Sequence, residues 1–204
     1  ELGVAAPSGT QAFLRQACEL IEHPEVCALR GALQMVLAEI SLCEQSMRDS
    51  EEQLARWHAD DDIVHKLDEV SGIGLLTASA LKTAVGKPER FASGRHLSAW
   101  LGMTPNEYSS GERRRLGCIS CKGNTYVRTL LIHGARAALL AAKGCQTRTP
   151  ERLTQLQRWA LQTAERIGHN KAAVALANKL VRICWAVWCH ERRFSGDWQS
   201  ARPA

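Results

Sequence analysis

The residues best suited to chemistry lie in one serine-rich, basic stretch in the middle of the chain. Ser109 and Ser110 precede Gly111. The cations that follow are Arg113, Arg114, Arg115, Lys122 and Arg128. A serine hydroxyl becomes a nucleophile when a base accepts its proton, and guanidinium groups bind phosphate oxygens bidentately. The pattern predicts attack of a serine on a DNA phosphodiester; a loop that is only basic and solvated is the alternative.

A second candidate contact with nucleic acid is a glycine turn earlier in the chain. Gly72 and Gly74 flank Ile73, and a helix rich in small residues follows. In the helix-hairpin-helix pattern, such glycines permit a tight turn and expose backbone N–H groups at the start of the next helix. Those groups bind a DNA phosphate without reading sequence. A plain helical hairpin with a glycine turn is the alternative.

The cysteines do not predict a metal site. Cys118 and Cys121 form a Cys-x-x-Cys pair, but structural zinc normally needs four ligands, and His133 and Cys145 lack suitable spacing. We expect the eight cysteines to be free and mostly buried thiols in a reducing cytoplasm. No signal peptide and no membrane partner are expected, because no apolar run reaches the roughly 20 residues that span a bilayer.

The elements that position these residues are predicted to be mainly α-helical. Hydrophobic residues make up 45% of the chain, and Ala, Leu, Arg and Glu outnumber Val, Ile and Thr. Residues 1–25 are expected to be a linker or a partial helix. Residues 26–58 carry a heptad pattern, which predicts a coiled coil that makes dimers, or else one amphipathic helix on a core. Its seam is Val26, Leu29, Leu33, Val36, Ile40, Cys43, Met47, Ser50, Leu54 and Trp57.

Residues 60–193 are predicted to form one helical domain, and residues 194–204 a flexible tail. Glycines, prolines and capping residues divide the domain into segments. The first four predicted helices run from Asp60 to about Val70, from Gly74 to Gly86, from Ser93 to Leu101 and from about Asn124 to Lys143. After a turn at residues 144–150, a fifth helix ends at Ile167, and the last helix contains Trp185 and Trp188. Residues 106–123 are expected to be a loop or a short hairpin. Within the fourth helix, Arg128 is predicted to point away from an apolar face that includes Tyr126.

The net charge of +5 says little by itself about nucleic acid. Its distribution says more, because cations concentrate in the middle of the chain while Asp60, Asp61 and Asp62 stand together.

Several consecutive segments resemble one known family. They are SGIGLLTA at 71–78, RFASGRHLSAWLGMTP at 90–105, YSSG at 108–111, NTYVRTLLIHGAR at 124–136 and NKAAVALANK at 170–179. In order and spacing they resemble the "one-ten" insertion-sequence transposases, in particular the "eleven-eleven" branch, over nearly all of the chain after about residue 25.

The resemblance implies a C-terminal transposase half that follows a coiled coil. Its serine before a glycine maps onto Ser110, with Ser109 as the nearest rival and Ser120 as a distant third. Arg113 to Arg115 and Lys122 would hold the backbone of DNA or RNA. The resemblance also implies a structured non-coding bridge RNA that selects the DNA, a dimer or tetramer of the chain, and work at the nucleoid in a bacterial cytoplasm.

In that family, an N-terminal domain with a ribonuclease-H-like fold carries four acidic metal ligands. The chain opens at Glu1 and lacks that domain, and Asp60 to Asp62 sit in one turn and cannot replace it. We therefore expect no cofactor in this chain, magnesium in the missing domain, and no activity of the fragment alone. A non-catalytic helix-hairpin-helix module that binds nucleic acid, and an inactive transposon remnant, are the alternative interpretations.

Overall fold

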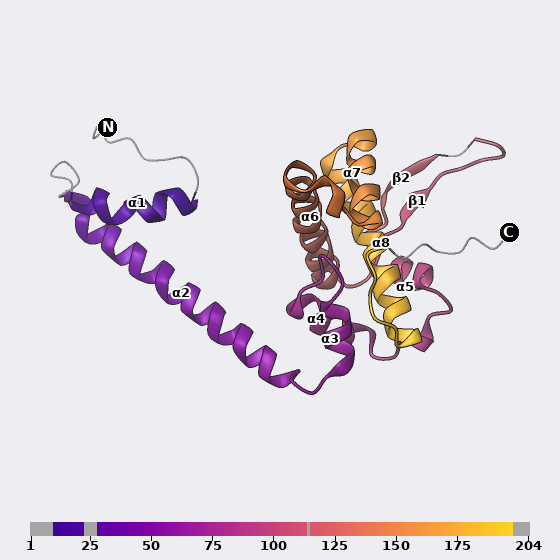
Figure 1. Ribbon diagram of the computed structural model, residues 1–204, viewed down its shortest axis with the longest axis horizontal. Helices are drawn as coiled ribbons and strands as arrows, with labels where there is room; N and C mark the ends of the chain where they lie inside the picture. Colours follow the sequence, from indigo (N-terminus) through magenta and orange to yellow (C-terminus); the bar gives the residue numbers. More distant parts are fainter. Residues whose placement is uncertain (1–9, 23–27, 114, 198–204) are drawn as a thin grey trace. The chain divides into compact units, whose positions relative to one another are not determined.

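The chain is mainly helical, as its sequence predicts. The computed structural model describes residues 10–22, 28–113 and 115–197 (Figure 1). The helices are α1 (Thr10–Glu22), α2 (Arg30–Trp57), α3 (Asp62–Asp68), α4 (Leu75–Val85), α5 (Gly94–Trp100), α6 (Thr125–Arg148), α7 (Gln155–Ile167) and α8 (His169–His190), with short 3-10 turns η2 (Pro88–Arg90) and η3 (Pro150–Arg152). Strands β1 (Pro105–Glu107) and β2 (Leu116–Ile119) form one antiparallel sheet.

The chain divides into two compact units, residues 1–54 and 55–204. In the first unit, Ala17 and Ile21 of α1 are buried, and the Arg30 Nε donates to the Ile21 carbonyl oxygen at 3.0 Å. None of the described residues of α2 is buried. The heptad residues Val36 and Met47 are 52% and 63% exposed. The predicted start of the heptad at Val26 lies outside the described residues.

Helix α8 is the centre of the second unit. It packs against α3, α5, α6 and α7, and Figure 1 shows it running beside them. Leu180 and Cys184 are fully buried and Trp188 nearly so, and the predicted helix through Trp188 is confirmed. By length and composition α8 could cross a membrane, but 44% of its most apolar window is buried inside the protein, and a core helix passes the same test.

Local capping explains where three of these helices begin. The side chains of Asp61, Ser93 and Asn124 accept hydrogen bonds from the backbone N–H groups of Val64, His96 and Val127. Each bond satisfies one of the donors that the first turn of a helix leaves unpaired. The predicted starts near these residues are confirmed.

Two backbones approach each other closely where the turn before α4 meets α6. Gly72 has φ +93°, which favours glycine, and a Cβ there would lie 2.9 Å from the Gly134 carbonyl oxygen. A Cβ at Gly134 would overlap the Gly72 carbonyl oxygen. The contact joins the α3–α4 hairpin to α6, so both glycines are required by packing.

The structure corrects the predicted end of one helix, because α6 does not end at Lys143 but continues through Gly144 to Arg148. In the predicted tail, Phe194 packs on the core and the Gly196 carbonyl oxygen accepts from the Leu156 N–H at 3.2 Å. Residues 198–204 lie outside the described residues, and the flexible tail stays a prediction.

The thiols are also less buried than expected. The cysteines whose side chains the structure describes are free thiols, namely Cys43, Cys118, Cys121, Cys145, Cys184 and Cys189. Among these, only Cys184 is buried, and burial raises its pKa to about 12.

The glycine contact predicts opposite effects for two substitutions in one helix. Gly134→Ala should lower the free energy of unfolding by about 1–3 kcal/mol, because backbone must move to admit a methyl group. Gly144→Ala should raise it by up to about 1 kcal/mol, since alanine favours helix and the nearest atom is the flexible end of Arg148 at 3.3 Å. Urea unfolding followed by circular dichroism measures both. Equal changes would contradict the proposed packing.

Candidate active site and nucleic-acid interface

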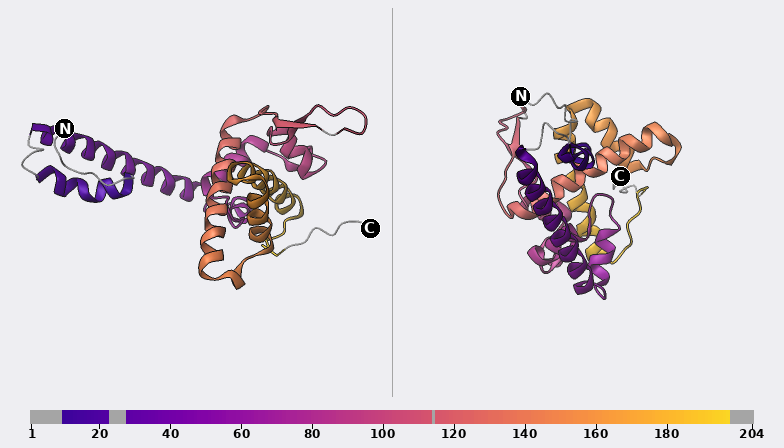
Figure 2. Two further views of the ribbon diagram at one scale, coloured as in Figure 1. Left: turned by 90° about the horizontal axis from the view of Figure 1, so that it is seen from above. Right: turned by 90° about the vertical axis from the view of Figure 1, so that its left-hand side faces the viewer.

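The serine-rich basic stretch forms a β-hairpin that extends from the helices of its unit (Figure 2). Pro105 pairs with Ile119 and Glu107 with Leu116, with an irregularity between the pairs. The ladder continues outward, because the Tyr108 N–H donates to the Arg115 carbonyl oxygen at 2.8 Å. The prediction of a loop or short hairpin is thus resolved in favour of the hairpin.

Ser110 occupies the last pair before the tip. Its N–H donates to the Arg113 carbonyl oxygen at 3.2 Å, and the Arg113 N–H donates back to the Ser110 carbonyl oxygen at 3.1 Å. Only Gly111 and Glu112 lie between them, and Gly111 has φ +55°. A two-residue loop with glycine in this conformation at its first position suits a type II′ hairpin turn. The turn presents the exposed Ser110 side chain at a fixed place in the hairpin.

The three candidate serines differ in what their side chains do. The Ser109 hydroxyl donates to Glu107 Oε1 at 2.7 Å and accepts from the Arg115 N–H at 3.0 Å, so it braces the hairpin. Ser120 lies at the root, where its N–H donates to the Thr104 carbonyl oxygen at 2.8 Å. Within the described part of the chain, the Ser110 hydroxyl makes no hydrogen bond, so no base is in position to accept its proton.

The predicted phosphate-binding cations lie at two levels of the hairpin. Arg113 and Arg115 are exposed near the tip, and the Lys122 side chain is exposed at the root. Arg114 lies outside the described residues. These placements leave Arg113, Arg115 and Lys122 accessible to a phosphate backbone.

Arg128 does not point away from the apolar face of α6, as the sequence suggested, but into the protein. It is 8% exposed, and its Nη1 donates to the carbonyl oxygens of Leu101 at 3.2 Å and of Lys122 at 3.3 Å. Its Nη2 donates to Thr125 Oγ1 at 3.1 Å. The guanidinium is occupied by internal acceptors, so the geometry gives it a positioning role and not a direct phosphate contact. Tyr126, predicted on the apolar face, is 57% exposed.

The root of the hairpin is held by close backbone contacts as well. A Cβ at Gly102 would overlap the Lys122 carbonyl oxygen, and one at Gly123 would overlap the Trp100 carbonyl oxygen. Both glycines have positive φ, +72° and +90°. Together with Arg128, they fasten the two ends of the hairpin to the end of α5 and the start of α6.

The two glycines of the turn before α4 have different surroundings. Gly72 packs against Gly134, Ala138 and Leu180, which makes it part of the core. Gly74 is exposed, caps α4 without a side-chain hydrogen bond, and has open space around the position of a Cβ. Of the two glycines, Gly74 is placed to offer backbone donors to a phosphate, and that contact stays a prediction.

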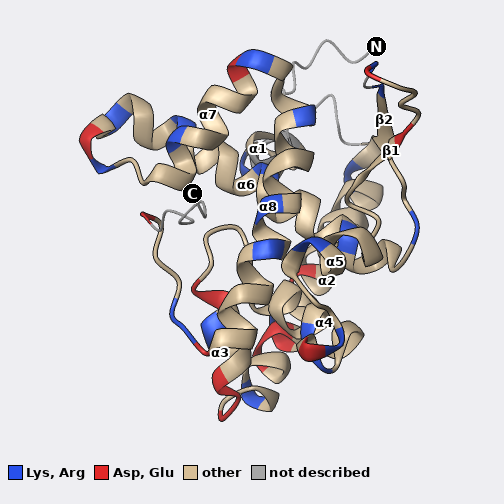
Figure 3. Cartoon of the chain, turned by 90° about the vertical axis from the view of Figure 1, so that its right-hand side faces the viewer, with Lys and Arg blue, Asp and Glu red and all other residues tan. Residues whose placement is uncertain are grey.

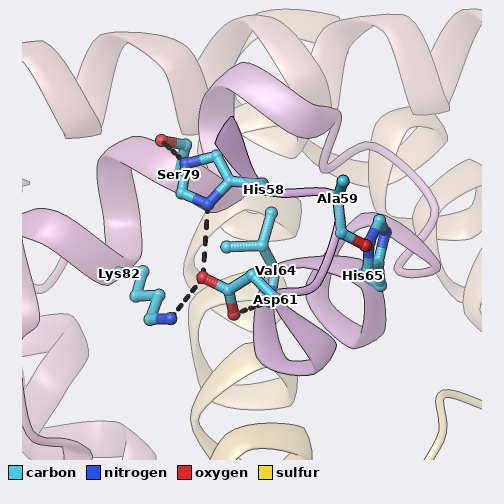
Figure 4. A network of polar contacts seen from close by, with 7 residues as sticks. All are labelled: His58, Ala59, Asp61, Val64, His65, Ser79 and Lys82. Carbon is cyan, nitrogen blue, oxygen red and sulfur yellow. Dashed lines mark hydrogen bonds and ion pairs between the residues drawn. The ribbon is translucent and has the colours of Figure 1, made fainter. Parts of the chain in front are cut away.

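A polar network that the sequence did not predict joins the end of α2, the start of α3 and α4 (Figure 4). His58 Nδ1 lies 3.2 Å from Asp61 Oδ2, and His58 Nε2 lies 2.8 Å from Ser79 Oγ. Lys82 forms an ion pair with Asp61. Burial tends to raise the pKa of Asp61, but hydrogen bonds from Lys82, Val64 and His58 outweigh it and hold the pKa below its usual value.

The order Ser79–His58–Asp61 resembles a hydrolytic triad, but its surroundings do not. Ser79 is 8% exposed within α4, where a substrate has no access to its hydroxyl, and Lys82 shares the carboxylate. We interpret the network as a structural clamp. Asp61 is three residues from His58 in the chain, but Ser79 is 21 residues away on α4. The network could therefore be found only from the structure, which shows that α4 packs beside His58.

No three His, Cys, Asp or Glu side chains of the described ranges come together as a possible metal site. Cys118 and Cys121 are both exposed, the first on β2 and the second in the left-handed region at φ 54°.

Comparison with known proteins places this arrangement in a family. Residues 64–150, from α3 through the hairpin to the end of α6, match the transposase IS116/IS110/IS902 family. The chain belongs to this transposase family. Its residues 64–150 include Ser110 and the described hairpin cations, and the resemblance predicted from the sequence motifs is confirmed.

Three relatives are similar to this chain over most of its length. It is 36% identical to a probable family 20 transposase of Pseudomonas aeruginosa over 90% of the chain and 52% of the relative. It is 32% identical to the transposase for insertion sequence element IS1111A of Coxiella burnetii, over 95% and 52%. For the transposase of element IS1328 of Yersinia enterocolitica, the identity is 33% over 96% and 56%. The chain therefore spans about half the length of these relatives.

The different settings of two arginines predict separable effects. Arg128→Gln should lower the free energy of unfolding by about 1–3 kcal/mol, because buried carbonyl oxygens lose their donor. Arg113→Gln should change the free energy of unfolding by less than about 0.5 kcal/mol but weaken DNA binding. The negative slope of log K against log salt should become less steep by about 1, because one phosphate contact is lost. Urea unfolding and fluorescence anisotropy at several salt concentrations measure the two effects. A stable Arg128→Gln variant that binds DNA poorly would restore Arg128 as a phosphate ligand.

Proposed function

We propose that this chain is the serine-bearing part of a DNA transposase, in which Ser110 attacks a DNA phosphodiester. The observation that carries the proposal is the exposed Ser110 hydroxyl, held at a hairpin tip opposite the returning arm, which carries Arg113 and Arg115. Membership of a transposase family supplies DNA as the substrate class. Ser109 suits the nucleophilic role less well, because its hydroxyl braces the hairpin.

The proposed step exchanges one phosphate ester for another. The Ser110 oxygen bonds to phosphorus, the bond from phosphorus to a deoxyribose oxygen breaks, and the leaving oxygen takes a proton. The serine proton passes to a base outside the described residues. Arg113, Arg115 and Lys122 hold the non-bridging oxygens and stabilise the charge that develops on them. A second DNA hydroxyl then attacks phosphorus, which rejoins DNA and restores the serine.

The chain needs further components for that step. Its described residues do not gather three metal-ligating side chains, so they do not fit a magnesium site. The resemblance implies that an acidic N-terminal domain supplies this site, that a bridge RNA selects the DNA, and that the fragment alone is inactive. We include these partners, and the bacterial cytoplasm as the place of action, in the proposal.

A second candidate function is a nucleic-acid-binding module without chemistry of its own, as an intact domain or an inactive remnant of a transposon. One observation favours it, namely that no base contacts Ser110 within the described ranges. In that case the hairpin cations and Gly74 would grip a phosphate backbone and the chemistry would lie elsewhere.

Substitution of Ser110 distinguishes these functions. In the full reading frame, incubated with transposon-end DNA, flanking RNA and magnesium, the unchanged protein should form a covalent protein–DNA adduct that survives denaturing electrophoresis. Ser110→Ala should reduce the adduct by at least about 1,000-fold, since it removes the attacking oxygen. Ser109→Ala is the matched control and should retain a measurable adduct. An adduct that persists in Ser110→Ala would exclude Ser110 as the nucleophile.

We also propose that α2 forms a homo-oligomer through its heptad seam. The seam residues Val36 and Met47 are exposed in the single chain, and uncovered apolar side chains at heptad spacing are typical of a coiled-coil partner surface. Cys43 lies on the same seam and is a free, exposed thiol. In a parallel dimer two copies of it would face each other.

Charge on the seam tests this oligomer. Met47→Asp should weaken dimerisation about 100-fold, because a carboxylate would be buried without a partner, whereas Gln45→Asp adds the same charge to the opposite face and should change little. Sedimentation velocity measures the dimer, and oxidation of Cys43 should cross-link it only when Met47 is intact. Equal sedimentation of the two variants would exclude the seam as the interface.

A further inference from the structure

Lys179 of α8 is held in an unusual position for a surface lysine. Its ammonium lies 4.2 Å from the centroid of the Trp159 ring on α7, and its side chain is only partly exposed. A cation over an aromatic face is attracted by the ring, and the packed stem restricts its rotamers. The charge of Lys179 is therefore fixed at the junction of α7 and α8.

Arg182 adds a second positive charge on the same face of α8. Residues three apart on a helix are neighbours, and Arg182 is exposed. Burial lowers the pKa of Lys179, and the positive charge of Arg182 lowers it further. Within the described ranges, neither residue has an ion pair with a carboxylate. The fold therefore holds like charges together without a compensating acid.

The start of α5, which lies against α8 at Arg182, carries a third exposed cation. A Cβ at Gly94 would lie 2.9 Å from the Arg182 Cα, so the start of α5 lies directly on α8 at that point. Arg95 follows Gly94 and is exposed, and it too has no ion pair in the described part of the chain. Figure 3 shows blue segments of α8 and α5 on the face turned to the viewer, with acidic segments gathered near α3.

The cations of α8 and α5 are connected to the root of the hairpin. Asn178, which precedes Lys179, donates from Nδ2 to the Met103 carbonyl oxygen at 2.9 Å. Met103 is buried and lies two residues before β1. One hydrogen bond thus ties the helix that carries Lys179 to the strand that leads toward Ser110.

We propose that Lys179, Arg182 and Arg95 form a second phosphate-binding surface, here named the α8 surface, which holds the backbone of the nucleic acid that the hairpin contacts. The inference rests on the proposed function, because it takes the DNA substrate as the occupant. A nucleic acid backbone fits this surface since it supplies a row of anions to cations that lack acids, and such contacts are independent of sequence. The hydrogen bond from Asn178 joins the helix that carries this surface to the root of the hairpin.

The test compares three double variants that each remove two positive charges. Lys179→Gln with Arg182→Gln, and Arg95→Gln with Arg182→Gln, change the α8 surface; the second pair keeps the packing of Lys179 on Trp159. Lys143→Gln with Arg148→Gln removes two exposed cations near the end of α6 and is the matched control. Circular dichroism and thermal unfolding check that all three fold.

Binding of a labelled random-sequence DNA duplex to this chain is measured by fluorescence anisotropy at several salt concentrations. Each α8-surface variant should bind at least about tenfold more weakly at about 0.1 M salt, and its slope of log K against log salt should fall by about 2. The control should change the slope by less than about 1. A duplex RNA of the same sequence is measured in parallel, and a loss of binding confined to the RNA would overturn DNA as the occupant.

Unchanged slopes in both folded α8-surface variants would overturn the inference, as would an equal loss in the control. Binding to polyglutamate with no binding to either nucleic acid would also overturn it and indicate an acidic protein partner. The adduct assay separates the two proposals. If the adduct requires Ser110 but the α8-surface variants bind DNA normally, the proposed function stands and the α8 surface is excluded. Loss of binding by these variants, with no adduct in the unchanged protein, supports the surface and excludes the serine chemistry.

Discussion

The position of the hairpin depends on one buried cation. The Arg128 guanidinium donates to the Leu101 carbonyl oxygen before the hairpin and to the Lys122 carbonyl oxygen after it. A single planar group thereby closes the segment between these residues, and its own place is fixed because Arg128 lies in the first turn of α6. Arginine suits this task because its donors have a fixed fork geometry and the group stays charged when buried. The hairpin can extend from the helices while its root stays ordered.

The central helix α8 connects that root to the rest of the second unit. Leu180 and Cys184 of α8 lie in the core, while Asn178 reaches the Met103 carbonyl oxygen just before β1. The same helix carries Lys179 and Arg182 on its outer face. Core packing on one side and cations on the other give α8 a role both in stability and in the proposed grip on nucleic acid.

The parts of the fold that were predictable are those controlled by neighbours in sequence. Asp61, Ser93 and Asn124 begin helices because a capping side chain needs only a backbone N–H three residues on. The tip of the hairpin is also local, since Gly111 supplies the required turn conformation. Family membership followed from ordered motifs and is confirmed. The predicted domain boundaries and the nucleophilic role of Ser110 stay predictions.

The sequence by itself determined the helical class, the capped starts of the helices and a basic segment between two helices, because these depend on contacts a few residues apart; the structure decided that this segment is a hairpin and not an open loop. Only the tertiary structure decided that Arg128 turns inward, since its acceptor on Leu101 lies 27 residues away. It also decided that Ser109 is a brace while Ser110 is not, and that Lys179 meets Trp159 from another helix. A periodicity assigns a residue to a face of a helix, but which atoms meet that face depends on packing between segments distant in the chain.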